Sequence, residues 1–116
     1  MTGKIVAFTT CATEQDAVAI ARRLLETRVA ACVSIVQPVR SLYHWQGQIQ
    51  DDCERLLIIK SRADLAGSLK AELCAVHGYE TPELVILPVS DGLPGYLAWI
   101  DRELVPPADA GPDELA

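Results

Sequence analysis

The most constraining feature of this chain is a long alternating segment between residues 29 and 60, interrupted by one turn signal. Apolar residues alternate with smaller or polar ones from Val29 to Ile35, and the alternation resumes after Pro38. The letters HWQG, which end at Gly47, indicate a tight turn, and the apolar run Leu56 to Ile59 follows it. The segment predicts a β-hairpin with arms of about 12 to 15 residues, roughly double the usual strand length.

A hairpin of this length has more apolar surface than one small domain can cover. The chain has 116 residues, half of them hydrophobic, which is typical of a single domain. Tyr43 and Trp45 lie near the turn, where a monomer would leave both rings in water. Pro38 cannot donate to a strand ladder and predicts a bulge or an edge. The sequence therefore predicts an oligomer that buries the excess surface.

Strand and helix patterns flank the hairpin on both sides. The β-rich segment Lys4 to Thr10 predicts a first strand. Thr13 is a suitable N-cap for a helix that extends to about Arg28. Ser61, with Asp64 three residues later, repeats the capping pattern before a second helix.

The last third of the chain adds a strand and a third helix. Gly78 is expected to end the second helix as its C′ residue, and Glu83 to Val89 predicts a fourth strand. One face of the third helix carries four apolar residues, namely Leu93, Leu97, Ile100 and Leu104. Residues 106–116, which begin with two prolines and contain three acids, predict a disordered acidic tail.

The predicted element order is β-α-β-β-α-β with an additional helix at the end. This is the ferredoxin-like arrangement, an α+β fold with an antiparallel sheet and both helices on one face. We expect residues 1–105 to form this domain, with an extended hairpin and a C-terminal helix. The third helix can cover part of the other sheet face, and a partner subunit would have to cover the rest.

Composition and charge exclude several classes of protein. The net charge is −6, which argues against nucleic acid as a partner because phosphate binding needs a basic face. No apolar run reaches the roughly 18 residues that a membrane span needs. The N-terminal segment does not resemble a signal peptide, and the four cysteines include no CxxC pair, so we expect reduced thiols in the cytoplasm and no structural zinc.

Motifs for catalysis are missing from the sequence. Ser41 and Ser61 lack a glycine elbow, and the letters DGLPG match neither a P-loop nor a dinucleotide-binding motif. Glu54 and Glu83 would form an acid/base pair only if the fold brought them together. We therefore predict a protein that is not an enzyme and has no organic cofactor.

Five segments resemble the CutA divalent-ion tolerance proteins in order and spacing: RVAACVSIV, SLYHWQGQI, LLIIKS, HGYETPELVILPV and YLAWI. The resemblance covers nearly all of residues 4–104. It implies a ferredoxin-like subunit in a tight trimer, similar to the P-II signalling proteins. It also implies a role in tolerance of divalent metals, chiefly copper, with no established catalytic reaction.

Two positions depart from the pattern of that family. His77-Gly78-Tyr79 stands where the family usually has His-Pro-Tyr. Some members carry a cysteine late in the first strand, at the position of Thr9, whereas Cys11 follows two residues later. If the strand continues, Thr9 and Cys11 face the same side of the sheet.

His77, Cys11 and Glu83 are the candidate metal ligands. Imidazole nitrogen binds copper, zinc and nickel, and thiolate suits Cu(I). His77 could join a cysteine, Glu83 or the equivalent histidine of a neighbouring subunit. The alternative is that His77 stabilises the C-terminal end of the second helix, while His44 in the hairpin turn is read as a surface residue.

A second candidate site is a ligand cleft between subunits. The residues predicted to line it are Tyr43, Trp45, Lys60, Tyr79, Glu83 and Trp99. Glu83 begins a predicted buried strand, where a charge is costly without a partner, and Lys60 is a suitable one. The same residues could instead form a trimer interface with aromatic anchors and no ligand. The alternative function is therefore a P-II-like signalling or scaffold trimer that binds a small metabolite or a protein.

Overall fold

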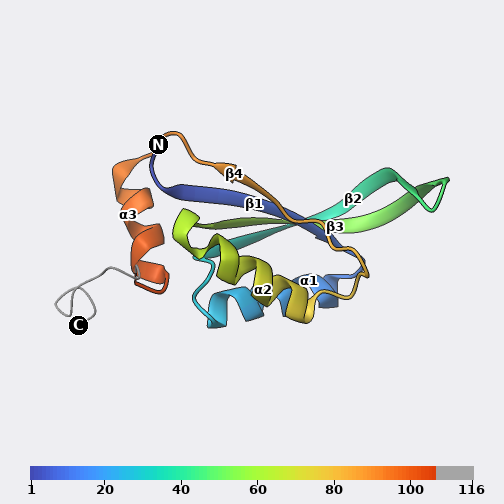
Figure 1. Ribbon diagram of the computed structural model, residues 1–116, viewed down its shortest axis with the longest axis horizontal. Coiled ribbons are helices and arrows are strands. Elements are labelled where there is room, and N and C mark those ends of the chain that lie inside the picture. Colours follow the sequence, from blue (N-terminus) through green and yellow to red (C-terminus); the bar gives the residue numbers. More distant parts are fainter. Residues whose placement is uncertain (107–116) are drawn as a thin grey trace.

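The computed structural model describes residues 1–106 and contains a four-stranded antiparallel sheet with three α-helices (Figure 1). The helices α1 and α2 lie on one face of the sheet, whose strand order is β2-β3-β1-β4. This architecture confirms the predicted ferredoxin-like α+β fold. The predicted tail, residues 106–116, lies outside the described residues except for Pro106. The elements are β1 (Lys4–Cys11), α1 (Glu14–Glu26), β2 (Cys32–Trp45), β3 (Gln48–Arg62), a 3-10 turn (Ala63–Leu65), α2 (Ala66–Val76), β4 (Val85–Pro88) and α3 (Pro94–Glu103).

The hairpin formed by β2 and β3 projects beyond the two helices (Figure 1). Its arms have 14 and 15 residues, as the alternation predicts. Gln46 and Gly47 form a two-residue turn with φ angles of 52° and 79°, and Trp45 pairs with Gln48 beside it. The register shifts between Val36 and Val39, which confirms the predicted irregularity at Pro38.

The predicted start of the first hairpin strand at Val29 is wrong, because α1 ends in a Schellman motif. Arg28 adopts a φ of 60°, and its N–H donates to the Leu25 carbonyl. The N–H of Val29 donates back to Leu24, which turns Val29 inward to 4% exposure. The strand therefore begins only at Cys32.

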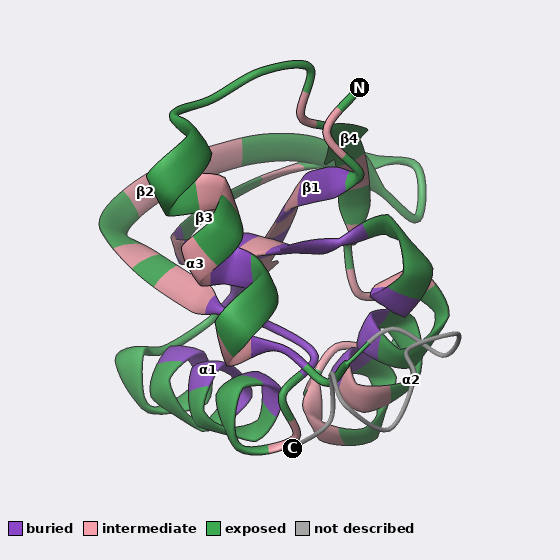
Figure 2. Cartoon of the chain, turned by 90° about the vertical axis from the view of Figure 1, so that its left-hand side faces the viewer, coloured by how far each residue is buried: buried purple, intermediate pink, exposed green. Residues whose placement is uncertain are grey.

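The main core lies between the sheet and the helices α1 and α2 (Figure 2). Thr13 caps α1 as predicted, since its hydroxyl accepts from the Asp16 N–H at 3.0 Å. The first strand extends one residue further than expected, so that Thr9 and Cys11 are both buried on the helix side. The side chains of β1 point alternately to the two faces of the sheet. The core on the helix side is built from Ile5, Ala7, Cys11, Ala17, Ile20, Leu24, Val29, Ala30, Leu57, Ile59, Leu69 and Leu73.

Thr9 carries an unsatisfied hydroxyl in this core. The side chain is fully buried, and its Oγ1 has no hydrogen-bond partner within residues 1–106. We expect Thr9→Val to raise the free energy of unfolding by about 1–2 kcal/mol, because a methyl group replaces an unpaired polar group. Urea unfolding measures the difference.

Ser61 provides the matched control for Thr9→Val. Its buried hydroxyl donates to the Val29 carbonyl at 2.6 Å, so Ser61→Ala should lower stability by about 1–2 kcal/mol. Equal losses of stability in Thr9→Val and Ser61→Ala would contradict the conclusion that the Thr9 hydroxyl lacks a hydrogen-bond partner. This contact also corrects the predicted role of Ser61, which lies inside β3 and caps no helix.

The second helix and the fourth strand are both shorter than expected. A 3-10 turn precedes α2, which begins at Ala66, and neither start carries a side-chain cap. Gly78 follows the C-cap residue His77, which is extended with φ −75° and ψ 136°. The last strand covers only Val85–Pro88, so Glu83 lies before it and is exposed.

The sheet face opposite α1 and α2 is apolar and largely open. The paired registers place Phe8, Ile58, Ser34 and Val85 in one row across all four strands. Further positions on the same face are Val6, Val36, Leu56 and Leu87. Val36, Val85 and Leu87 remain 42–48% exposed. This open sheet face therefore has the apolar composition of a protein core, although its side chains are in contact with solvent.

The third helix lies across the end of the sheet, away from the hairpin turn (Figure 1). Ile100 and Leu104 pack into a second small cluster with Ala31 and Leu65. Leu93, predicted on the same buried stripe, is 78% exposed because it precedes the first helical turn. The side chain of Asp101 fixes the helix to the sheet through Lys4 at 3.1 Å and Arg62 at 3.3 Å.

Candidate functional site

An open groove of about 1030 Å³ lies where the hairpin leaves the body of the domain. We call it the hairpin-root groove. Strands β2 and β3 supply one side of it, and the segment after α2 supplies the other. It is lined by Thr10, Ala12, Arg40, Ser41, Leu42, Tyr43, Trp45, Asp52, Cys53, Glu54, Gly78, Tyr79, Glu80, Thr81 and Glu83.

A buried carboxylate forms the inner part of the hairpin-root groove. Glu54 is only 4% exposed, and the Tyr79 hydroxyl donates to its Oε2 at 2.5 Å. Burial and this hydrogen bond raise the pKa of Tyr79 above its ordinary value, because the nearby negative charge disfavours a phenolate. The tyrosine therefore remains a hydrogen-bond donor at neutral pH.

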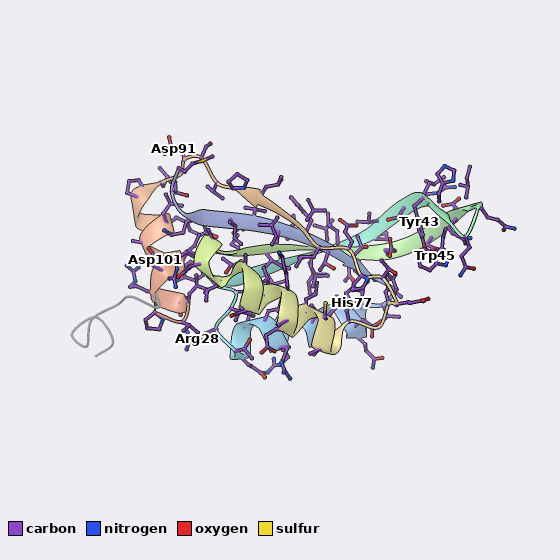
Figure 3. All side chains as sticks on the ribbon, viewed as in Figure 1. Arg28, Tyr43, Trp45, His77, Asp91 and Asp101 are labelled. Carbon is purple, nitrogen blue, oxygen red and sulfur yellow. The ribbon has the colours of Figure 1, made fainter. Side chains whose placement is uncertain are left out.

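A second tyrosine–carboxylate pair lies further along the hairpin. The Tyr43 hydroxyl donates to Asp52, and this contact raises the pKa of Tyr43 to about 12. Trp45 follows two positions along the same strand, towards the turn (Figure 3). Both rings are 39% exposed, so the groove offers aromatic surface beside carboxylates.

His77 connects α2 to the end of β1. The ring Nε2 donates to the Thr10 carbonyl at 2.8 Å, since a carbonyl can only accept. The ring Nδ1 then accepts from the Tyr79 N–H at 3.1 Å. Both nitrogens are thus engaged in a neutral ring, which holds Tyr79 in position for Glu54.

The other two candidate metal ligands lie in different surroundings. Cys11 is 1% exposed, and burial raises the pKa of its thiol, which disfavours the thiolate that metals bind. Glu83 is exposed and lines the hairpin-root groove. Within residues 1–106 no three His, Cys, Asp or Glu side chains are grouped closely enough to hold a metal ion.

The predicted cleft residues divide between two places. Tyr43, Trp45, Tyr79 and Glu83 all line the hairpin-root groove. Lys60 instead lines a smaller cavity of about 210 Å³ beside α3. Its ammonium lies 5.9 Å from the centre of the Tyr96 ring, and Trp99 stacks on that ring at 5.6 Å. The expected contact of Lys60 with Glu83 is not among the ion pairs of the described residues.

Asp52 and Glu54 were not predicted to line the cleft, although the register of the hairpin contains a signal for both of them. A two-residue turn at 46–47 sets Ser41 opposite Asp52. The same register sets Val39 opposite Glu54, because the irregularity near Pro38 begins only beyond this pair. The residues alone did not reveal that the segment after α2 meets this part of the hairpin, where Tyr79 contacts Glu54.

The two tyrosines should make the protein less stable at alkaline pH. Their folded-state pKa values lie above the ordinary value of 10.0, so the stabilisation is complete below pH 10. It is lost as pH rises further, because the unfolded chain then releases protons that the folded chain retains. The free energy of unfolding should fall less steeply above pH 10 in a Tyr43→Phe, Tyr79→Phe variant. Parallel slopes for the two proteins would contradict the raised pKa values.

The fold and the groove define a ferredoxin-like, P-II-like α+β protein with an overlong hairpin. Residues 5–103 match the family described as CutA1 divalent ion tolerance protein. The chain belongs to this family, as its resemblance in sequence implies. None of the helices in residues 1–106 is long and apolar enough to cross a membrane.

Relatives and solved structures agree with this assignment. Protein CutA of Mus musculus is 42% identical over 96 residues, which cover 83% of this chain and 54% of the mouse protein. The divalent-cation tolerance protein CutA of Pectobacterium atrosepticum is 43% identical over 96 residues, covering 81% of this chain and 87% of that protein. The structure of Cut A1 from Thermus thermophilus has a TM-score of 0.85 at 38% identity, covering 88% of this chain and 99% of that one.

Proposed function

We propose that this protein acts in the tolerance of divalent cations, chiefly copper, as a cytoplasmic homotrimer that binds cations without catalysis. The observation that carries the proposal is the family match over residues 5–103, together with relatives named for divalent-cation tolerance. The chain spans about half of the length of the mouse relative.

The open sheet face supports the trimer. It presents an apolar row formed by Val85, Phe8 and Ile58, and neither hydrophobic core cluster of residues 1–106 includes these side chains. The hairpin adds exposed apolar side chains near its turn, including Leu42 at 62% and Ile49 at 70% exposure. Surfaces of this kind are typical of protein interfaces.

The four cysteines support the cytoplasm as the compartment. All of them are free, and Cys53 and Cys74 are exposed. Exposed thiols persist in a reducing compartment and would be oxidised outside it.

A copper site does not fit the residues of a single subunit. Both nitrogens of His77 make hydrogen bonds, and Cys11 is buried as a thiol. We therefore propose that His77, Cys11 or Glu83 contributes to cation binding only together with residues of a neighbouring subunit. To bind a cation, the His77 ring would have to give up its hydrogen bond to the Thr10 carbonyl or to the Tyr79 N–H.

The alternative is a P-II-like signalling or scaffold trimer that binds a small metabolite or a protein. The volume and aromatic lining of the hairpin-root groove favour this second function. The two functions are compatible in one trimer, since cation ligands and the groove need not coincide.

The variant His77→Ala tests the cation proposal. We expect its free energy of unfolding to fall by about 1–3 kcal/mol, because the Thr10 carbonyl and the Tyr79 N–H lose their partner. Calorimetric titration with copper and thermal melting, both performed on the wild type and on His77→Ala, measure the two effects. A loss of copper affinity of about 10-fold or more would support His77 as a ligand. Unchanged affinity would remove His77 from the cation site, and absence of copper binding to the wild-type trimer would contradict the cation proposal.

A further inference from the structure

The hairpin-root groove contains negative charge without matching positive charge. Its four carboxylates, on Asp52, Glu54, Glu80 and Glu83, take part in none of the ion pairs within residues 1–106. Arg40 also lines the groove, but Asp51 holds it through two hydrogen bonds of 2.9 and 2.7 Å. The charge of the groove is therefore left for a ligand to balance.

Glu54 is the informative member of this group because it is buried. At 4% exposure Glu54 has little contact with water, and it takes part in none of the ion pairs of residues 1–106. Only Oε2 has a hydrogen bond, from Tyr79, and Oε1 has no partner within the described part of the chain. A cation placed in the groove would pair with this carboxylate.

The aromatic side chains of the groove indicate what kind of cation fits. Tyr43, Trp45 and Tyr79 line the same cavity as the carboxylates. Aromatic faces attract organic cations and also pack against an apolar body. A volume of about 1030 Å³ is ample for a molecule that has both parts.

A metal ion fits the same groove poorly. Hard divalent cations need six or more oxygen ligands, whereas tyrosine hydroxyls already donate to one oxygen each of Glu54 and Asp52. The described residues also bring no three metal-ligating side chains together.

We propose that the hairpin-root groove binds a small organic cation, whose ammonium or guanidinium head pairs with Glu54 and whose apolar body packs against Tyr43 and Trp45. The inference rests on the proposed ligand-binding role of the groove and names the ligand class for it. The competing occupant is a lysine or arginine side chain of a second copy of this chain.

Calorimetry with phenethylamine and its neutral analogue phenethyl alcohol tests the inference on the full-length protein. We expect the amine to bind and the alcohol to bind at least about 10-fold more weakly, as loss of a charge-assisted contact implies. Glu54→Gln should weaken amine binding by about 10-fold or more. Its amide oxygen can still accept from Tyr79, so the melting temperature should stay close to that of the wild type.

The control variant is Glu14→Gln, which removes the same charge at the exposed start of α1. It should leave amine affinity unchanged within about twofold, since screened surface charge acts weakly at a distance. Equal weakening of amine binding in both variants would show that affinity depends only on the net charge of the protein, and this would overturn the inference.

Three further results would overturn the inference. Equal affinity for the amine and the alcohol would show that the groove binds apolar ligands without recognising their charge. Binding of Cu²⁺ or Mg²⁺ that depends on Glu54, without amine binding, would make it a metal site. No amine binding, together with a weaker trimer in Glu54→Gln, would assign the groove to a side chain of the second copy. None of these results contradicts copper binding or the trimer, which the His77 titration and mass measurements test separately.

Discussion

Replacing Ile58 with glutamate should convert the proposed trimer into single chains of 12.6 kDa. Ile58 lies at the centre of the open sheet face, paired with Phe8 on one side and Ser34 on the other. In an assembled trimer each subunit would bury an unpaired carboxylate there, at a cost of several kcal/mol per ion. In a monomer the same side chain faces water, so the subunit itself should still fold.

Light scattering of Ile58→Glu and of a matched variant measures the effect. Val18→Glu adds the same charge at an apolar position of α1 that is 42% exposed, and it should leave the mass near three times that of one chain. A wild-type mass of one or two chains would contradict the trimer. A trimeric Ile58→Glu protein would show that the subunits meet elsewhere.

Removing the carboxylate of Asp101 should cost about 2–3 kcal/mol of folding free energy. Asp101 pairs with Lys4 and Arg62, whose side chains are both only 9% exposed. Breaking a buried ion pair typically costs about 3–5 kcal/mol. Among the ion pairs of residues 1–106, Lys4 would lose its partner, whereas Arg62 would keep Asp64 at 2.6 Å. The smaller figure of about 2–3 kcal/mol applies because Asp101 itself is 47% exposed, so water already screens the pair.

Glu103 provides the control on the same helix. It pairs with Arg28 at 3.1 Å, with both side chains substantially exposed. Glu103→Ala should therefore change stability by no more than about 1 kcal/mol. Chemical denaturation of both variants measures the contrast, and similar losses would show that the buried cations do not depend on Asp101.

Much of the fold could be predicted because its strongest signals are local. The period-two alternation and the turn at Gly47 predict both hairpin arms, and Thr13 predicts the start of α1. The errors occur where tertiary contacts decide. Ser61 fits a capping pattern, yet the neighbouring Arg62 pairs with Lys4 and keeps the strand going. Arg28 adopts a left-handed conformation that glycine usually marks, so the sequence has no signal for it.

The candidate site could be predicted only in part for a similar reason. Tyr43 and Trp45 share a strand, and Tyr79 and Glu83 follow one helix, so short-range patterns bring each pair to one place. Trp99 lies on α3 and Lys60 lies beside this helix, because the packing of α3 is set by distant residues. The contact of the His77 ring with Thr10 depends on where α2 meets β1, which no spacing in the sequence reveals.

The central position of β1 determines when the sheet can be completed. This strand is synthesised first, yet its neighbours are β3, where Lys4 meets Arg62, and β4, where Ile5 meets Pro88. The β2–β3 hairpin closes through a two-residue turn and can form early, whereas pairing across such long separations is slow. A growing chain therefore carries an apolar strand with both edges unpaired until β3 has been made, and with one edge unpaired until β4 follows near the end of the domain.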